Sequence, residues 1–239
     1  MKFSVEHMAL RATAIKSALF QDLTDELVSL LLSSASARQV DANCRLFHQG
    51  DAPEQLLQVV SGLVRMTQIR ADGTQTTLRI MRTGDLLGCV AVLQQFPYPA
   101  TATAIEEAVV LTWKADQFLA MLQQHPTIMK NALGIVGART RDMVQRIAEM
   151  SDKNVERRIA TALLHIAAQA GTAGEDGIQI QFPVTRDDLA EMAGLTYFTV
   201  SRTLSLWQKQ GVVRNGRQRM MVLNPKRLAE IADGGAGSV

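Results

Sequence analysis

The segment Thr185–Leu206 reads TRDDLAEMAGLTYFTVSRTLSL and carries the most specific pattern in the chain. Thr185 can cap a helix, with Asp188 three positions later as in a capping box. Gly194 offers the backbone freedom that a tight turn needs, and Thr196 can cap a second helix. A small residue, a turn glycine and a branched residue at positions 190, 194 and 200 are typical of two closely packed helices. The segment therefore predicts a helix-turn-helix.

Charge is distributed unevenly around this segment. The net charge of the 239 residues is only +2, yet no acidic residue lies between Glu191 and Glu230. The cations in that interval are Arg202, Lys209, Arg214, Arg217, Arg219, Lys226 and Arg227. Such a stretch indicates a polyanionic partner, with a solvated basic face as the simpler alternative.

In a helix-turn-helix the first turns of the second helix enter the major groove of DNA. Base or phosphate contacts are therefore expected from both helix starts. The expected contact residues of the two helices are Thr185, Arg186, Thr196, Tyr197, Phe198, Thr199, Ser201 and Arg202.

The residues that follow predict a β-hairpin wing. Residues 212–223 read VVRNGRQRMMVL, and Asn-Gly between two apolar runs is typical of a hairpin turn. Asn215, Arg217 and Arg219 would lie along DNA phosphates, where contacts position a protein more than they read sequence. Pro225 is then expected to start a last helix that ends at Ala232.

Short β-prone runs separated by turn glycines occupy the region from about Arg38 to Trp113. Gly62, Gly73 and Gly84 recur at intervals of 11 residues, the spacing of short strands in a barrel or roll. Residues 12–35 and the residues after Asp116 have helical periodicity, whereas the glycine-rich residues 171–177 predict a loop.

A heptad seam follows the β-rich region. Its members are Met129, Leu133, Val136, Thr140, Met143, Ile147 and Met150. This narrow a/d pattern is typical of a two-stranded coiled coil, so we expect it to join two copies of the chain. The alternative is an amphipathic helix that packs only on its own roll. Residues 151–154, SDKN, interrupt the pattern and mark a hinge.

These patterns predict an α+β fold with an N-terminal β-roll (residues 1–125), a dimerisation helix (126–151) and a C-terminal winged helix-turn-helix DNA-binding domain (152–239); the family resemblance described next implies that the roll is like a cyclic-nucleotide-binding jelly roll. The whole order resembles the CRP/FNR family of bacterial transcription regulators. The segments that carry the resemblance are FHQGD (47–51), SGLVR (61–65), GDLLG (84–88) and LTYFTVSR (195–202).

The resemblance implies a homodimer that binds a palindromic operator on double-stranded DNA. It also implies contacts with RNA polymerase through the loops at residues 70–75 and 170–176. Activation of transcription is the working expectation, although the sequence does not distinguish an activator from a repressor.

Two departures from the family pattern limit which effector molecules the protein can respond to. The cyclic-nucleotide branch holds its ligand with a Glu and an Arg after the GDLLG element. Here Cys89 stands at the Glu position, and Tyr98-Pro99-Ala100 replaces Arg-Ser-Ala. A buried phosphate without a cation is unfavourable, so we expect no cAMP binding. No cysteine precedes Cys44, so the cluster of the oxygen-sensing branch cannot form, and no iron–sulfur cofactor is expected.

The recognition helix also departs from the FNR pattern. It keeps Ser201 and Arg202, but Phe198 stands where FNR-like proteins place a Glu that reads cytosine. With this aromatic pair and the GRQR wing, the chain is most similar to the NnrR/DNR-type branch. That resemblance implies a response to nitric oxide, redox or haem state, with haem as the candidate cofactor.

Cys89 and His125 are the candidate effector-pocket residues, because haem needs an axial His, Cys or Met. The alternatives are that Cys89 is a small buried apolar residue and that His125 is an ordinary capping histidine.

Composition and motifs exclude other classes. Two cysteines rule out a disulfide scaffold, and no apolar run approaches about 18 residues, so we expect a cytoplasmic protein without a membrane partner. Rolls of this kind also occur in metal-dependent dioxygenases, but His-x-His is absent, so no enzyme, catalytic residue or metal site is expected. The remaining alternative is an effector-independent DNA-binding regulator whose roll serves only dimerisation and polymerase contact.

Overall fold

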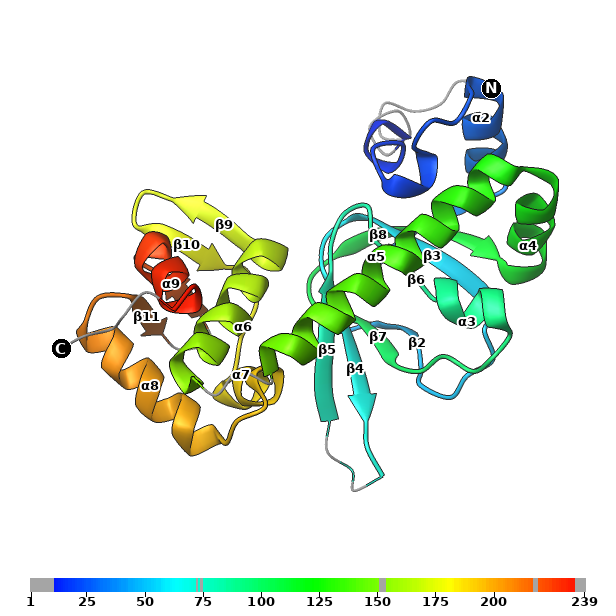
Figure 1. Ribbon diagram of the computed structural model, residues 1–239. Coiled ribbons are helices and arrows are strands. Elements are labelled where there is room, and N and C mark those ends of the chain that lie inside the picture. Colours follow the sequence, from blue (N-terminus) through cyan, green and yellow to red (C-terminus); the bar gives the residue numbers. More distant parts are fainter. Residues whose placement is uncertain (1–10, 72, 74, 151–153, 217–218, 235–239) are drawn as a thin grey trace. The chain divides into compact units, whose positions relative to one another are not determined.

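The computed structural model describes residues 11–71, 73, 75–150, 154–216 and 219–234. The chain divides into two units, Met1–Asp142 and Met143–Val239, and each unit is described by itself (Figure 1). Most of the long helix therefore belongs to the first unit, and its last turns belong to the second.

The strands described in the first unit form two four-stranded antiparallel sheets, with orders β1–β8–β3–β6 and β2–β7–β4–β5. Their bounds are β1 Ser36–Val40, β2 Arg45–Phe47, β3 Gln55–Ser61, β4 Val64–Ile69, β5 Gln75–Met81, β6 Leu86–Leu87, β7 Thr101–Ala104 and β8 Ala108–Lys114. Strand β3 is buried from Leu56 to Val60, because both of its faces are covered. The roll predicted from the turn glycines is confirmed.

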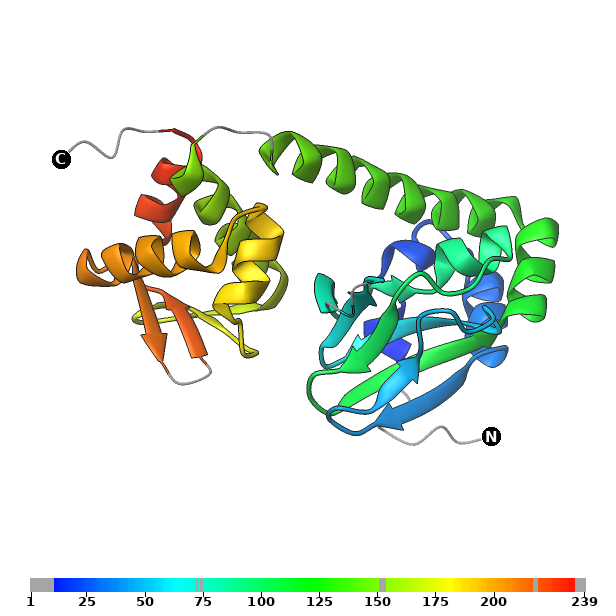
Figure 2. The same ribbon diagram turned by 90° about the horizontal axis from the view of Figure 1, so that it is seen from below.

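Helices cover one side of the roll. Their bounds are η1 Ala18–Phe20, α2 Asp25–Ser33, α3 Cys89–Gln94, α4 Ala115–Gln124 and α5 Pro126–Met150. One core fills the space between the sheets around Val59 and Phe47. A second core joins β3 and β8 to the helices and includes Trp113, Phe118 and Ile128. Figure 2 shows the first-unit part of α5 lying along the roll.

The helix expected over residues 12–35 is interrupted. Asp22 has a left-handed φ of 58°, and Thr24 caps a separate helix, α2, by accepting a hydrogen bond from the backbone N–H of Leu27 at 3.4 Å. The apolar periodicity continues across the break because both pieces pack on the same core. The start signals at residues 22–26 therefore do begin a second helix, and the apolar periodicity correctly marked the buried face of both pieces.

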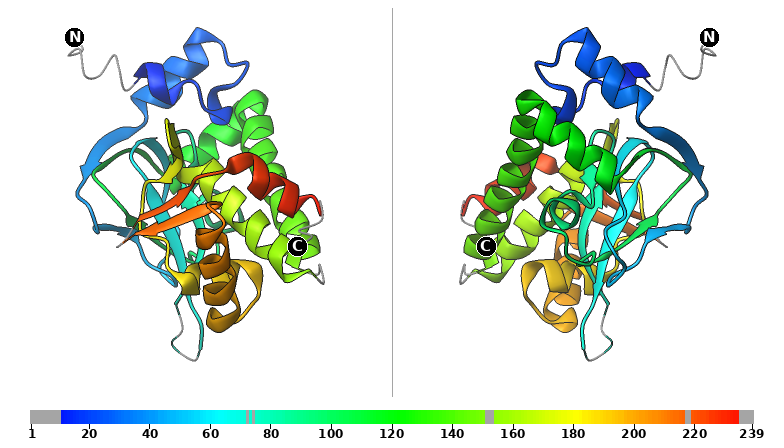
Figure 3. Two further views of the ribbon diagram at one scale, coloured as in Figure 1. Left: turned by 90° about the vertical axis from the view of Figure 1, so that its left-hand side faces the viewer. Right: turned by 90° about the vertical axis from the view of Figure 1, so that its right-hand side faces the viewer.

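The second unit packs four described helices with one antiparallel sheet of order β11–β12–β10–β9. Their bounds are α6 Val155–Ala170, β9 Gly171–Gly174, β10 Gly177–Ile180, α7 Arg186–Ala193, α8 Tyr197–Lys209, β11 Val213–Gly216, β12 Arg219–Val222 and α9 Pro225–Ala232. Helix α9 packs against α6 (Figure 3). Pro225 and Ala232 are the ends predicted for this helix.

Two turn predictions in this unit were wrong. Residues 171–177 were expected to be a loop, but most of them form the hairpin β9–β10, in which Gly177 has a φ of +129°. The Asn215-Gly216 pair was expected to make the turn of the wing, but both residues belong to β11 and pair with β12. The buried pair Val213 and Val222 lies opposite in this register, and a register that buries an apolar pair overrides a local turn preference.

Candidate functional site

The start of α7 forms the predicted capping box. The hydroxyl of Thr185 accepts from the backbone N–H of Asp188 at 3.0 Å, and the Asp188 carboxylate accepts from the backbone N–H of Thr185 at 2.9 Å. Gly194 ends the helix with a left-handed φ of 62°. Thr196 then caps α8 by accepting from the backbone N–H of Thr199 at 3.3 Å. The helix-turn-helix predicted from this segment is confirmed.

The packing of the two helices follows the predicted pattern. Leu189, Val200 and Leu204 are buried, and Ala190 leaves room for close approach. Leu195 is only half-buried, since it lies in the turn before the second helix.

The start of α8 presents aromatic side chains to solvent. Phe198 is 82% exposed and Tyr197 is 41% exposed, with their rings edge-to-face at a centroid distance of 5.8 Å. Arg202 is exposed one turn further on, whereas Thr199 and Ser201 are half-buried rather than fully outward. The two neighbouring rings form an exposed apolar surface at the start of α8.

The remaining expected contacts lie on α7 and the wing. Thr185 is exposed and Arg186 is half-buried. Arg217 lies outside the described residues, and the side chains of Asn215 and Arg219 are not described. Arg214 is exposed on β11 and its guanidinium lies 3.7 Å from the Asp176 carboxylate.

Arg158 is a residue that sequence reasoning missed. It lies on α6, and its guanidinium donates to the carbonyl oxygens of Ala193 and Gly194 at 2.8 and 2.5 Å. A cation at this position satisfies carbonyl groups that the end of α7 leaves unpaired. No spacing pattern in the chain indicates this long-range contact.

Helix α5 has one face on the roll and another face open. Ile128 and Ala132 are fully buried against the roll. Among the predicted seam residues, Leu133, Thr140 and Met143 are exposed, whereas Met129 and Val136 are half-buried at the edge of the core. The side chains of Ile147 and Met150 are not described.

Three large apolar side chains of α5 are exposed. Leu133, Met143 and Val144 are 55%, 64% and 62% exposed. Burying large apolar side chains is favourable, so an uncovered row of them on one helix favours association with another surface.

The two candidate effector residues lie on different elements. Cys89 begins α3 and is only 1% exposed. Burial raises the pKa of the Cys89 thiol, and the nearby Arg139 guanidinium opposes that rise. His125 is the half-buried C-cap residue that follows α4, and its carbonyl oxygen accepts from the backbone N–H groups of Ile128 and Met129.

Tyr98 fills the segment where the cyclic-nucleotide branch has its phosphate-binding Arg. The ring is 2% exposed and stacks on Phe47 at a centroid distance of 3.9 Å. Its hydroxyl donates to the carbonyl oxygen of Gln55 at 2.5 Å and accepts from the backbone N–H of Gln55 at 3.1 Å. Burial raises the pKa of this phenol. The side chain therefore uses its hydrogen bonds within the roll.

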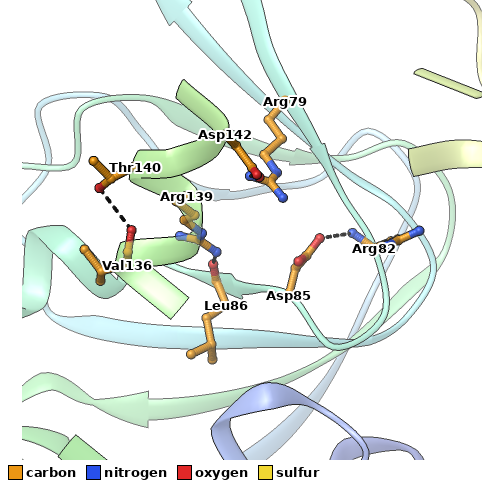
Figure 4. Close-up of polar contacts among 8 residues, drawn as sticks. All are labelled: Arg79, Arg82, Asp85, Leu86, Val136, Arg139, Thr140 and Asp142. Carbon is orange, nitrogen blue, oxygen red and sulfur yellow. Dashed lines mark hydrogen bonds and ion pairs between the residues drawn. The ribbon is translucent and has the colours of Figure 1, made fainter. Parts of the chain in front are cut away.

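Arg139 and Arg79 are the other residues that sequence reasoning missed (Figure 4). The Arg139 guanidinium donates to the carbonyl oxygen of Leu86. Burial, together with the nearby Arg79, lowers the pKa of Arg139. Arg79 forms an ion pair with Asp142 at 3.3 Å. Arg139 is not one of the predicted seam residues, and its position around α5 matches that of the buried residues Ile128 and Ala132.

Over the described ranges, no group of three His, Cys, Asp or Glu side chains is arranged to hold a metal ion. In the same part of the chain, every helix is too short or too polar to span a bilayer.

Comparisons with known proteins agree with this architecture. Residues 37–125 match the cyclic nucleotide-binding domain family, and residues 157–231 match the Crp-like helix-turn-helix domain family. A curated relative named cyclic AMP receptor protein, from Thermus thermophilus, is 31% identical over 91% of this chain and 98% of its own. The transcriptional activator protein FnrA of Stutzerimonas stutzeri is 25% identical, over 79% of this chain and 77% of its own.

Solved structures show the same fold. The catabolite activator protein of Thermus thermophilus is 31% identical with a TM-score of 0.52, over 92% of this chain and all of that one. Another CRP/FNR-family regulator from Thermus thermophilus has a TM-score of 0.70 at 21% identity, over 84% of this chain and all of that one. The chain belongs to the CRP/FNR family of DNA-binding transcription regulators.

Proposed function

We propose that the chain is a homodimeric, sequence-specific regulator whose two α8 helices read a palindromic operator. The observation that carries this proposal is the exposed start of α8, where Phe198 is 82% exposed on a helix whose opposite face is anchored by the buried Val200. A helix held in this way can enter the major groove with a fixed orientation. The cation-rich stretch after Glu191 supplies attraction to phosphates.

Dimerisation through α5 is proposed from its open apolar row. Leu133, Thr140 and Met143 recur at heptad spacing and are exposed, whereas Ile128 and Ala132 already pack on the roll. A second copy of α5 would cover the exposed row. Two subunits are also what a helix-turn-helix needs to contact half-sites about 34 Å apart.

We propose that the signal is not cAMP. The Thermus relative is named for cAMP, but Cys89 and Tyr98 replace charged residues here, and the buried Tyr98 stacks on Phe47 within the roll. Nitric oxide, redox or haem state is our candidate signal on the sequence resemblance. The competing proposal is a regulator without an effector, and the raised pKa of Cys89 supports it against a thiolate sensor at that residue.

The same proposal places the protein in the cytoplasm, where chromosomal DNA lies, and gives it RNA polymerase as a partner. The hairpin β4–β5 and the hairpin β9–β10 contain the loops at which the family resemblance implies polymerase contact.

The test starts from an operator selected from a random double-stranded DNA library by the full-length protein. An inverted repeat is expected among the selected fragments. Arg202→Ala should weaken binding to that operator by about 1–3 kcal/mol while leaving affinity for scrambled DNA nearly unchanged, because the variant cannot form a bidentate hydrogen bond with guanine. Lys209→Ala, at the end of the same helix, is the matched control and should lower both affinities equally. Equal losses for Arg202→Ala on both DNAs would contradict sequence reading by Arg202.

The signal is tested by the absorption spectrum of the purified protein with and without haem, and by operator affinity with haem, nitric oxide, oxidant or cAMP added. Affinity that changes with none of these agents would support the effector-independent alternative. Affinity that rises with cAMP would contradict the proposal that Tyr98 replaces a cAMP site.

A further inference from the structure

A pocket of about 450 Å³ lies in the first unit, outside the segment that the cyclic-nucleotide branch uses for its ligand. Its walls come from the residues before α2, the turn between β5 and β6, and helix α5. Representative wall residues are Ala18, Gln21, Gly84, Leu86, Gly134 and Ala138. The pocket adjoins the Cys89 site through Arg139, although neither Cys89 nor Tyr98 forms part of its walls.

The guanidinium groups of Arg79 and Arg139 line this pocket, and only that of Arg79 is paired with a carboxylate in the described part of the chain. Arg79 forms an ion pair with Asp142 at 3.3 Å, but its buried Nε has no hydrogen-bond partner. Arg139 donates to the neutral carbonyl oxygen of Leu86 and makes no ion pair within the described part of the chain. Asp85 and Asp142 also line the pocket, but the Asp142 carboxylate is paired with Arg79, and the Asp85 carboxylate accepts from the backbone N–H of Arg82 at 2.9 Å (Figure 4).

Opposing influences act on the pKa of Arg139, because Asp85, Cys89 and Asp142 raise it. Burial and the like charge of Arg79 both lower the pKa of Arg139, which means that the surroundings disfavour the cation. A half-buried cation is stabilised most by an anion that forms hydrogen bonds with it. Carboxylate and phosphate groups match the planar fork of a guanidinium.

The rest of the pocket has room and polar groups for the body of a ligand. A Cβ added at Gly134 would meet no atom within 4 Å, so this side of α5 is open. The Lys130 ammonium and the Asp22 carboxylate also line the pocket. Asn131 donates to the carbonyl oxygens of Leu19 and Gln21 at 2.9 and 2.7 Å, so the wall before α2 is attached to α5.

We propose that this pocket binds a small metabolite that carries a carboxylate or phosphate group, with the oxyanion held by Arg139 and Arg79. The bound metabolite would connect the segment before α2, the β5–β6 turn and α5. Gly134 and Ala138 lie on a different face of α5 from Leu133 and Thr140, so a second copy on the seam would leave the pocket open. A regulatory effect of this site rests on the proposed function, but its occupancy does not.

The test measures anion binding to the full-length protein without DNA. Inorganic phosphate and citrate are titrated separately at constant ionic strength set by chloride, and binding is followed by calorimetry and by the thermal unfolding temperature. Saturable stabilisation by phosphate alone, by citrate alone or by both identifies the preferred oxyanion.

The variants locate the site. Arg139→Gln should weaken binding by about tenfold or more, as expected for the loss of a charge-assisted hydrogen bond. Gly134→Leu fills the open space without removing a charge and should also abolish binding, while alanine-like helix propensity keeps α5 folded. Arg82→Gln, an exposed cation that does not line the pocket, should bind as the parent does.

The proposal is overturned if neither anion stabilises the parent protein beyond chloride. It is equally overturned if Gly134→Leu and Arg139→Gln are stabilised as much as the parent, because the effect would then be a general salt effect. Operator binding is measured on the same samples without added anion, so failure of the DNA-binding proposal would be seen separately.

Discussion

The guanidinium of Arg158 on α6 donates to the carbonyl oxygen of Gly194, the glycine at the turn of the helix-turn-helix. It also donates to the carbonyl oxygen of Ala193, the last residue of α7. One side chain from outside the motif therefore fixes the end of its first helix. The neighbouring Arg157 makes a similar contact with the carbonyl oxygen of Ala232 at 3.1 Å, at the end of α9.

Replacement of Arg158 should disturb the turn more than the rest of the unit. Arg158→Ala is expected to lower the free energy of unfolding by about 1–2 kcal/mol, because charge-assisted bonds to helix-end carbonyls are removed. Operator affinity, measured by fluorescence anisotropy well below the unfolding temperature, should also fall. Arg157→Ala is the control, with a similar loss of stability and unchanged affinity. Equal affinities for both variants would show that Arg158 does not position the turn.

The phenol of Tyr98 should matter to stability through both of its hydrogen bonds. Tyr98→Phe leaves the backbone groups of the half-buried Gln55 without that partner, so we expect the free energy of unfolding in urea to fall by about 1–3 kcal/mol. Tyr197→Phe, with its exposed ring, should change stability by less than about 0.5 kcal/mol. An unchanged free energy of unfolding for Tyr98→Phe would mean that water replaces the hydroxyl as the hydrogen-bond partner.

Tyr98 also makes a prediction about alkaline pH. Its pKa is raised in the folded protein, so the folded state favours the neutral phenol more than the unfolded state does. The stability it contributes is complete below the ordinary tyrosine pKa of about 10 and is lost as pH rises above that value. The free energies of unfolding of the parent and of Tyr98→Phe, measured across this range, should therefore become more similar as pH rises. Parallel curves would contradict the assignment.

The two cysteines should differ in reactivity. Cys44 is exposed and Cys89 is buried, and burial raises the pKa of the Cys89 thiol, so little thiolate forms there at neutral pH. Iodoacetamide should modify Cys44 in the native protein and Cys89 only when urea unfolds it, as peptide mass spectrometry would report. Rapid native modification of Cys89 would favour a thiol sensor at that position.

The exposed ring of Phe198 should read thymine methyl groups. Phe198→Ala is expected to weaken operator binding by about 0.8 kcal/mol for each thymine methyl group that the ring no longer covers, with little change in stability since the ring is 82% exposed. Replacing operator thymines by deoxyuridine should weaken operator binding by the parent protein by the same amount and leave operator binding by the variant unchanged. Leu206→Ala, on the same helix, is the control. If the losses of binding free energy caused by Phe198→Ala and by deoxyuridine add together, Phe198 does not contact the thymine methyl groups.

Local signals account for most of what the sequence predicted correctly. Thr185, Asp188, Gly194 and Thr196 act through bonds within a few residues, so spacing alone locates the two helices. Pro225 likewise starts α9 as predicted. The turn of the wing was misplaced because the Val213–Val222 pairing, a contact between strands, fixes the register.

Long-range contacts explain what the sequence could not predict. Arg158 reaches residues 35 and 36 positions away, and Arg139 reaches Leu86 across 53 positions. Neither contact leaves a periodic trace in the chain. The seam residues on α5 were predicted from heptad spacing, but only the structure distinguishes the half-buried Val136 from the exposed Leu133.

The central claim is that two chains joined along α5 bind one palindromic operator. The most direct measurement is the mass, by analytical ultracentrifugation, of the complex with an operator fragment and with a fragment carrying about five extra base pairs between half-sites, half a helical turn. We predict that two chains bind one operator fragment and that the parent protein binds the extended fragment much more weakly. The Leu133→Glu variant should bind the operator much more weakly than the parent does, whereas the Arg141→Glu variant should bind it as tightly as the parent. One chain per fragment, bound equally well at either spacing, would contradict the account.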